Sequence, residues 1–482
     1  MYFKTSILIL ISQALSVKAQ IGQLRWGTNT NLFDGLTVTW SNTGNSDSIQ
    51  WGYTNQLDKG VFAGIKRPGY STSAFFHYSF SSVPPDTTIY FRFWNSQTNK
   101  WESLRTFATA PDPEKNKFTF AALGDCRTDP NVLTNISNSV TAHHPALALF
   151  NGDLTASGTS ASEYNTFFSA SANFLSQCVV LHAEGNHDAG NSSIFSNLWN
   201  LPQTNGTNLY YSVRYGNALF ITLNSCDFNG TMLTWLHNTL VAAESDTSIV
   251  WKIASFHHPF FTIGAHQGDV NLYKSTIWKE FDDHGVDIIF NGHDHNYQRS
   301  KPINLKISSS YPVAKYGNRP GEGRLQIISG GAGASLYSKG STVDAWAISI
   351  FNSSYNYVMC DINSKIATIT AYNSSNTKID NVILDKSQLA NSSEIQKLFV
   401  EPIQIFPNPV KNQFTLVYNY PEIGFVKFTL TDEKGKIISE EKLHKKEPVL
   451  EYNHDVSGYK KGIYNIMISS ESREDHNILI VQ

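Results

Sequence analysis

The sequence has little cysteine, little net charge and, beyond its first residues, no long apolar run. It contains 482 residues and four cysteines, none in a C-x-x-C pair, so a zinc ribbon is not expected. The formal net charge of −3 argues against a protein that coats nucleic acid or binds membranes through a basic surface. No segment after residue 20 approaches the ~20 consecutive apolar residues that span a bilayer.

The first residues are typical of a secretory signal peptide. Lys4 precedes an apolar stretch over residues 7–15, and the small Ala19 ends the segment. This pattern predicts a signal peptide over residues 1–19 and a secreted or cell-surface protein. Export permits disulfide bonds, and three pairings of the four cysteines are open.

Hydrophobic patterning divides the rest of the chain into three parts and a linker. Residues 20–111 contain short alternating strands separated by turn clusters, which predicts a β-sandwich. Over residues 117–384 apolar strands alternate with helix-like segments, as in an α/β domain. Residues 385–402 form a polar linker, and residues 403–482 are typical of a small β module. The expected helices of the α/β part cover residues 131–141, 160–174, 232–243 and 272–281.

Five apolar runs in the α/β part end in Asp, Asn or His. Eleven of the fifteen histidines lie between His143 and His295, which marks where chemistry is expected. Because strands hold their ends rigidly, such residues can converge at the carboxyl edge of a sheet. The five motifs are Gly124-Asp125, Gly152-Asp153, Gly185-Asn186-His187-Asp188, His257-His258-Pro259 and Gly292-His293-Asp294-His295.

These residue types suit a site with two metal ions. Hard cations bind carboxylate oxygens and imidazole nitrogens, and one carboxylate can bridge two ions. Asp153 is the expected bridge because it lies centrally in the series, and the amide of Asn186 adds a ligand without charge. A water between two cations becomes hydroxide near neutral pH and can attack phosphorus. His187, next to Asn186, is placed to donate a proton or stabilise an oxyanion.

Each motif alone has an ordinary structural explanation. A Gly-Asp pair after a strand is usually a turn, and His-His-Pro is more often a loop than a site. The combination in order, each time at a strand end, favours a metal site. His266 alone would be a surface histidine, and Cys126 is expected to pack beside the site rather than to serve as a ligand.

The five motifs resemble those of the calcineurin-like metallophosphoesterase superfamily, and specifically of its purple acid phosphatase branch. The resemblance implies a four-layer αββα catalytic domain with two ions, of Fe, Zn or Mn. It places Asp125, Asp153 and His295 on one ion, and Asp153, Asn186, His257 and His293 on the other. It also implies that His187 and His266 contact substrate and take part in catalysis, with Asn186 beside the substrate.

The flanking parts show resemblances of their own. Residues 20–111 are similar to the fibronectin-III-like domain that precedes the catalytic domain in plant-type and bacterial members. Residues 403–482 resemble the C-terminal sorting domain of the type IX secretion pathway, through Phe406-Pro-Asn-Pro409 and Gly462-Ile-Tyr464. This implies the secretion machinery as a partner.

One position departs from the purple branch, and another departs from other members of the superfamily. Three residues after Asp153, where purple members carry an iron-binding tyrosine, this chain has Ala156. We therefore expect a protein that is not purple, and a visible charge-transfer band in the pure protein would contradict this. Arg127 follows the first motif, where other superfamily members have a histidine nearby. It either holds a phosphate oxygen or pairs with an acid.

The sequence thus predicts an exported, metal-dependent phosphoric ester hydrolase that acts on small phosphomonoesters. A phosphodiesterase or nucleotidase on the same scaffold is one alternative. A non-catalytic surface-binding protein with a degenerate metal site is another. In a third, Trp40, Trp51 and Trp94 bind carbohydrate, although aromatic residues at strand spacing are more often sandwich core.

Overall fold

The computed structural model describes residues 21–42, 47–67, 74–96, 98–318, 321–340, 342–387, 403–419, 423–446, 449–470 and 474–482. The expected signal peptide and most of the expected linker lie outside these residues. The chain divides into two compact units, Met1–Gln388 and Leu389–Gln482, and each is described by itself.

The N-terminal strands of the first unit form two layers around an aromatic core. One layer contains β2, β6 and β5, and the other contains β4, β3, β7 and β8, with β9 paired to β7. Trp40 and Trp51 are buried between them, so neither is free to bind a sugar, while Trp94 lies half-buried against Trp101. The strands are β1 (Gly22–Thr28), β2 (Leu36–Asn42), β3 (Ser48–Gly52), β4 (Gly60–Ala63), β5 (Ile65–Arg67), β6 (Ala74–Ser79), β7 (Thr88–Asn95), β8 (Lys100–Trp101) and β9 (Arg105–Ala108).

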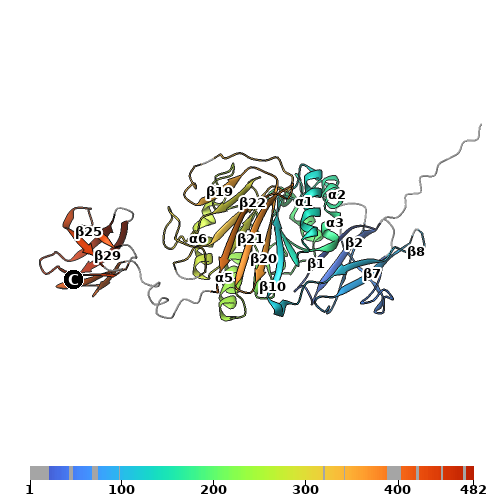
Figure 1. The fold of residues 1–482 in the computed structure, drawn as a ribbon, viewed down its shortest axis with the longest axis horizontal. Coiled ribbons are helices and arrows are strands. Elements are labelled where there is room, and N and C mark those ends of the chain that lie inside the picture. Colours follow the sequence, from blue (N-terminus) through green and yellow to red (C-terminus); the bar gives the residue numbers. More distant parts are fainter. Residues whose placement is uncertain are drawn as a thin grey trace, which may run out of the picture. The chain divides into compact units, whose positions relative to one another are not determined.

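One of these layers continues into the following α/β part through a single strand pair. β1 runs antiparallel to β2 and parallel to β12, with Trp26 opposite Val179. A ten-stranded sheet results, in the order β22-β21-β20-β10-β11-β12-β1-β2-β6-β5 (Figure 1). Its further strands are β10 (Lys117–Leu123), β11 (Leu147–Phe150), β12 (Val179–His182), β20 (Asn356–Asn363), β21 (Ile366–Asn373) and β22 (Lys378–Asp385).

A second, seven-stranded sheet faces the first across a buried core. Phe120 of the first sheet meets Phe220 and Phe290 of the second, with ring centroids 5.1 and 5.8 Å apart. The strand order is β13-β14-β15-β16-β18-β17-β19. These strands are β13 (Tyr211–Tyr215), β14 (Ala218–Thr222), β15 (Trp251–Ser255), β16 (Ile288–Asn291), β17 (Tyr297–Ser300), β18 (Leu325–Ser329) and β19 (Ile348–Asn352).

Helices cover the outer side of both sheets (Figure 1). α1 and α3 contact β20 and β1 of the first sheet, whereas α5 and α6 share an apolar core with the second. Asp129 caps α1 by accepting from the amides of Asn131 and Val132, and Pro130 occupies its first turn. The helices are α1 (Pro130–Ala142), α2 (Ala161–Ala170), α3 (Ala172–Gln177), α4 (Ser192–Leu198), α5 (Gly230–Ser245) and α6 (Asn271–Asp283).

The second unit is a small β-sandwich with its own core. A three-stranded sheet, β23-β24-β27, and a four-stranded sheet, β26-β25-β28-β29, enclose Phe414, Leu416, Phe428 and Ile466. Its strands are β23 (Ile403–Phe406), β24 (Gln413–Asn419), β25 (Gly424–Asp432), β26 (Ile437–Lys445), β27 (Val449–Asp455), β28 (Gly462–Ser469) and β29 (Glu474–Val481).

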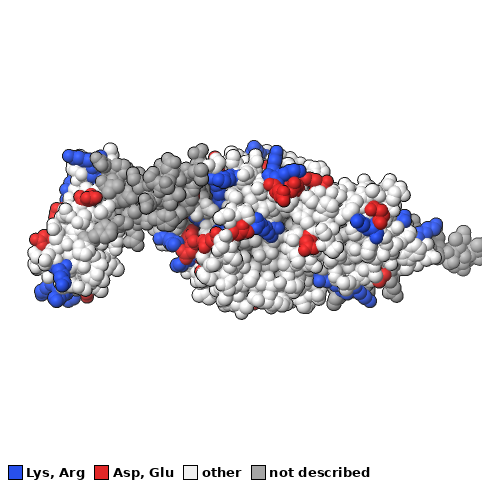
Figure 2. Space-filling model, turned by 90° about the horizontal axis from the view of Figure 1, so that it is seen from below, with Lys and Arg blue, Asp and Glu red and all other residues white. Residues whose placement is uncertain are grey.

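Three further features of the described residues are the length of their helices, the state of their cysteines and the charge of their surface. None of their helices is long and apolar enough to cross a membrane. Their four cysteines are all free thiols, and three of them are buried. The face drawn in Figure 2 carries basic and acidic side chains in small mixed groups, in keeping with the low net charge.

Candidate metal centre

The five motifs meet at the carboxyl ends of strands from both sheets. In the first sheet the strand end at Leu123 lies opposite the strand end at Phe150. Asp125 and Asp153 therefore both lie just beyond paired strand ends. In the second sheet Ser255 lies opposite Phe290, which places the turns before His257 and His293 beside each other. Parallel strands in register therefore bring residues far apart in the sequence to one edge.

The turns at this edge are strained and closely packed. Asp125, Asp153 and His293 all have positive φ, of 60°, 57° and 69°, a backbone conformation that residues other than glycine rarely adopt. A Cβ on Gly152 would lie 2.7 Å from His257 Nδ1, and one on Gly292 would lie 2.2 Å from Asp125 Oδ2. The glycines are needed because the backbone passes this close to the polar groups.

His257 lies at the centre of one group of four candidate ligand atoms, which includes its own Nε2. Its Nε2 lies 2.9 Å from Asn186 Oδ1, 3.1 Å from His293 Nδ1 and 3.4 Å from Asp153 Oδ1. Its Nδ1 lies 2.7 Å from the carbonyl oxygen of Asn151, which fixes the proton there and leaves the Nε2 lone pair facing the group. Nitrogen and oxygen atoms that converge in this way suit a Zn, Mn or Fe ion.

A second group of ligand atoms adjoins the first. His295 Nε2 lies 3.6 Å from Asp125 Oδ1, and its Nδ1 is held by the carbonyl oxygen of Ser335 at 2.7 Å. Asp125, Asp153 and His257 can each offer an atom within 4.8 Å of the others. The structure thus brings all six sequence-predicted metal ligands to one place, with Asp153 between the two groups.

Electrostatics at this edge favour a cation. Asp125 and Asp153 are fully buried, and burial, then the charge of Asp153, raises the pKa of Asp125. Burial also lowers the pKa of His257, and that of His295 to about 4, so both imidazoles are neutral at ordinary pH. Neutral imidazoles and carboxylates are suitable ligands for a cation. The charge of the cation would also relieve the repulsion between Asp125 and Asp153.

Arg127 lies at the same edge and pairs with the central carboxylate. Its Nη1 contacts Asp153 Oδ2, and its side chain is 14% exposed. It also hydrogen-bonds Tyr337, whose ring stacks on His295 with centroids 4.0 Å apart. Tyr337 was not predicted, because it comes from a loop far along the chain that carries no motif.

His187 points back to the same carboxylate. Its Nδ1 lies 2.8 Å from the carbonyl oxygen of Ala156, and its Nε2 lies 4.0 Å from Asp153 Oδ2. Its backbone amide donates to Asp153 Oδ1 at 3.0 Å. Ala156 therefore orients His187 through its main chain. It is the residue at the position where purple members have a tyrosine.

His266 reaches the centre together with an acid that the sequence analysis missed. Asp269 Oδ2 lies 2.9 Å from His293 Nε2 and 3.4 Å from His266 Nδ1. The bond to Asp269 occupies one nitrogen of His293 and leaves the other, Nδ1, toward His257. The only sequence signal for Asp269 is its position three residues after His266.

Two buried acids within the motifs support loops instead of facing the ligands. Asp188 accepts from the amides of Asp153, Leu154 and Gly185, at 2.8 to 3.1 Å. Asp294 accepts from the amides of Ala265 and His266 and from the Thr262 hydroxyl. Burial raises the pKa of both carboxyls, and these hydrogen bonds act in the opposite direction because they stabilise the charged form.

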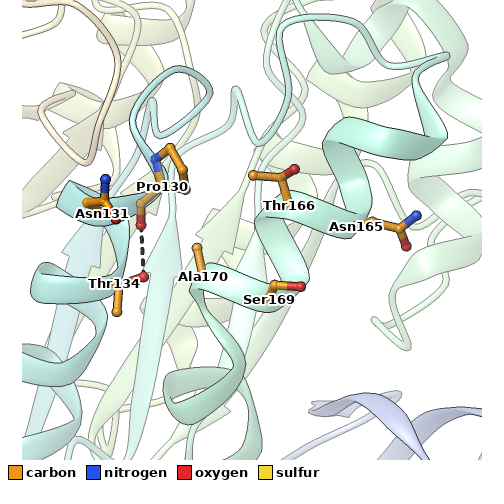
Figure 3. A pocket seen from close by; sticks show the side chains of 7 residues that line it. All are labelled: Pro130, Asn131, Thr134, Asn165, Thr166, Ser169 and Ala170. Atoms are coloured by element: carbon orange, nitrogen blue, oxygen red, sulfur yellow. Dashed lines mark hydrogen bonds between the residues drawn. The ribbon is translucent and has the colours of Figure 1, made fainter. Parts of the chain in front are cut away.

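The hollow in Figure 3 lies apart from this chemistry. It has a volume of about 420 Å³ and is formed between α1 and α2. Its lining contains no titratable side chain, so nothing there resembles a catalytic group. The lining residues are Pro130, Asn131, Thr134, Asn165, Thr166, Ser169 and Ala170.

Comparison with known families defines the class of two segments. Residues 118–297 match the family model described as calcineurin-like phosphoesterase, and residues 404–482 match the secretion system C-terminal sorting domain. The chain therefore contains a calcineurin-like phosphoesterase domain and a secretion sorting domain, as the resemblance implied.

Two curated proteins that are similar in sequence to this chain are purple acid phosphatases. Purple acid phosphatase 15 of Arabidopsis thaliana is 26% identical over 285 residues, covering 51% of this chain and 53% of that protein. Purple acid phosphatase 1 of Ipomoea batatas is 23% identical, covering 56% of this chain and 62% of that protein. The chain thus spans little more than half the length of these relatives.

Two solved structures share the fold. The purple acid phosphatase PPD1 from yellow lupin (Lupinus luteus) has a TM-score of 0.63 at 14% identity, covering 79% of this chain and 76% of that chain. A structure of PhoD has a TM-score of 0.51 at 12% identity, covering 78% of this chain and 95% of that chain. This chain is a homologue of purple acid phosphatases, and their family implies a metal site with two ions.

Proposed function

We propose that this protein is an exported phosphoesterase that uses two metal ions to hydrolyse phosphomonoesters. The observation that carries the proposal is the convergence of His257 Nε2 with Asn186 Oδ1, His293 Nδ1 and Asp153 Oδ1 within 2.9 to 3.4 Å. The relatives named as acid phosphatases support the same class of reaction.

The proposed ligands follow the two groups of atoms. Asp153 would serve both ions, of Fe, Zn or Mn, because its Oδ1 faces His257 Nε2 and it can also offer an atom within 4.8 Å of Asp125. When bound, the ions would withdraw charge from the phosphoryl oxygens and lower the pKa of a bound water. Asp125 and His295 complete one ion, and Asn186, His257 and His293 complete the other.

His187 is the proposed proton donor to the leaving oxygen, with His266 as a second substrate contact. The carbonyl of Ala156 holds His187 Nδ1, so its Nε2 is the atom left toward the site. In its protonated form the ring can donate from Nε2 to an ester oxygen. Asp269 orients His266 through the 3.4 Å contact to its Nδ1.

Arg127 is the proposed holder of the phosphate, with Asn186 beside it. A guanidinium has five donors, so Arg127 can keep Asp153 and Tyr337 and still bind a phosphate oxygen. A phosphomonoester carries up to two negative charges and a diester only one. A fixed positive charge therefore favours the monoester.

The proposed setting is the cell surface or the medium. A signal peptide over residues 1–19 would direct export, and the sorting domain would engage a secretion machinery. The proposed architecture has a fibronectin-III-like sandwich (20–111), a four-layer αββα domain (117–384), a linker (385–402) and the sorting domain (403–482).

A matched pair of substrates tests the substrate class. We expect kcat/KM for 4-nitrophenyl phosphate to exceed that for the bis-ester at least ~10-fold, and Arg127→Met to lower the monoester value about 10- to 100-fold, as for loss of one charged hydrogen bond. A higher value for the diester would favour the phosphodiesterase alternative. No turnover of either ester with Fe, Zn or Mn would favour the binding protein.

A further inference from the structure

A second cluster of metal-binding side chains lies on helices α5 and α6, outside the centre described above. His237 belongs to α5, Glu280 to α6, and His284 directly follows α6. Glu280 Oε2 lies 3.0 Å from His237 Nδ1 and 3.3 Å from His284 Nε2. One carboxylate oxygen thus faces two imidazole nitrogens that come from different helices.

We propose that His237, Glu280 and His284 bind a zinc-like divalent ion that fastens α5 to α6. Ligand atoms about 2.0 Å from a tetrahedral zinc ion lie roughly 3.3 Å from one another, and the two distances above are close to this spacing. All three residues can offer an atom within 4.8 Å of the others. A water would complete the tetrahedron.

Glu244 supports one of these ligands from behind. Its Oε2 lies 3.1 Å from Nδ1 of His284, in an electrostatic contact rather than a directed hydrogen bond. A carboxylate on the far nitrogen of a histidine is the common device that orients a metal-binding imidazole. A small side-chain rotation on ion binding would let Glu244 accept the Nδ1 proton, which would leave the lone pair of Nε2 toward Glu280. Glu244 is therefore a positioning residue.

The shared oxygen argues for a metal rather than for two separate ion pairs. His237 and His284 can each contact Glu280 either as a neutral ring that donates an N–H or as a protonated ring, and because their centroids are 5.2 Å apart two protonated rings would repel each other. Neutral imidazoles around an ion avoid this repulsion, and Glu244 and Glu280 supply the balancing negative charge.

The cluster is accessible and separate from the strand-end centre. The side chains of His237, Glu280 and His284 are 52%, 25% and 13% exposed, so an ion can enter from solvent. His266 and Asp269 precede the start of α6, whereas His284 follows its end. A helix of 13 residues is about 20 Å long, so the two sites are distinct.

Zinc content of the full chain tests the proposal. Protein saturated with Zn²⁺ and freed of unbound metal should hold one ion more per chain than His237→Ala. The matched control is His476→Ala, because His476 forms an exposed pair with Glu474 at 2.9 Å in the other unit. This control should hold as much zinc as the wild type. Equal zinc in wild type and His237→Ala would overturn the proposal.

Glu244→Gln tests the supporting role separately. We expect the extra ion to bind 10- to 100-fold more weakly, with unchanged stoichiometry at saturation. The d–d spectrum of Co²⁺-loaded protein would report the same ion directly, with a tetrahedral band missing from His237→Ala. Circular dichroism of each variant shows whether it folds. A folded Glu244→Gln with wild-type affinity would remove Glu244 from the site, and an unchanged Co²⁺ spectrum in His237→Ala would overturn the site itself.

Discussion

At the scale of single residues, the candidate metal centre consists of side chains that face the ligand groups and side chains that hold them. Residues of the first kind follow strands and stand in motifs, so the sequence predicted them. Asp269, Tyr337 and the loop-supporting roles of Asp188 and Asp294 depend on contacts between distant loops. No local pattern contains that information, and these were missed.

Asp269→Asn tests whether the missed acid supports the centre. The change removes the negative charge beside His293 Nε2, which lies 2.9 Å from Asp269 Oδ2. We expect metal affinity at the centre to fall 10- to 100-fold, measured by competition with a chromophoric chelator. Glu451→Gln, an exposed carboxylate of the other unit, is the control and should bind metal as the wild type does. Equal affinities in both variants would contradict the assignment.

His182 provides a pH dependence that is independent of substrate. It is fully buried between Phe150 and Trp199, with its ring centroid 3.5 Å from that of Trp199, and burial lowers its pKa well below 6.5. The unfolded chain therefore takes up a proton near pH 6.5 that the folded chain does not. His182 should therefore contribute a fall in the free energy of unfolding of about 1.4 kcal/mol per pH unit as the pH drops below 6.5.

His182→Leu should remove this contribution. Urea unfolding from pH 7 to pH 5 would then show a shallower slope of the free energy against pH than in the wild type, whatever the change in absolute stability. His476→Ala, at an exposed histidine, serves as the control. An identical slope in His182→Leu and wild type would show that His182 does not carry the effect.

At the scale of elements, local sequence patterns predicted individual helices and strands. They did not predict which strands far apart in the sequence pair with each other. The predicted helix over residues 131–141 corresponds to α1, but the one over residues 160–174 is broken at Ser171 into α2 and α3. Hydrophobic periodicity continues across such a break, so it gave no warning. The pairing of β1 with β12 also left no local signal, because β12 is a short apolar run that could pair in several ways and β1 is a mixed strand that points to no particular partner.

Trp26 tests the importance of this junction. It is 1% exposed, stacks on Phe107 at 3.8 Å between centroids, and donates from its indole nitrogen to the carbonyl of Ser176 at 3.0 Å. Trp26→Ala should lower the free energy of unfolding of this unit by about 3–5 kcal/mol, because it empties a buried site. Val61→Ala, on the exposed face of β4, should cost much less. Equal losses in chemical denaturation would contradict the role of β1 as a junction.

At the scale of the whole molecule, the chain has two units with separate cores, and segments of them match two different families. The first unit places charged and imidazole groups where strands of two sheets end. The second is a small sandwich that matches a sorting domain and carries no such set of strand-end ligands in the part that is described. The sequence analysis distinguished these two parts, because motif-rich strand ends and a compact β module differ in composition as well as in position.

The most direct test of the account is metal-dependent hydrolysis by wild type and Asp153→Asn. Each protein is stripped of metal, reloaded with Fe, Zn or Mn, and assayed on a phosphomonoester, with bound metal counted in the same samples. We predict metal-dependent turnover in the wild type and a loss of at least ~100-fold in Asp153→Asn. A loss of that size exceeds the one expected for a residue that only supports a metal ligand. Equal turnover in both proteins, or none in the wild type with any of these metals, would contradict the central claim.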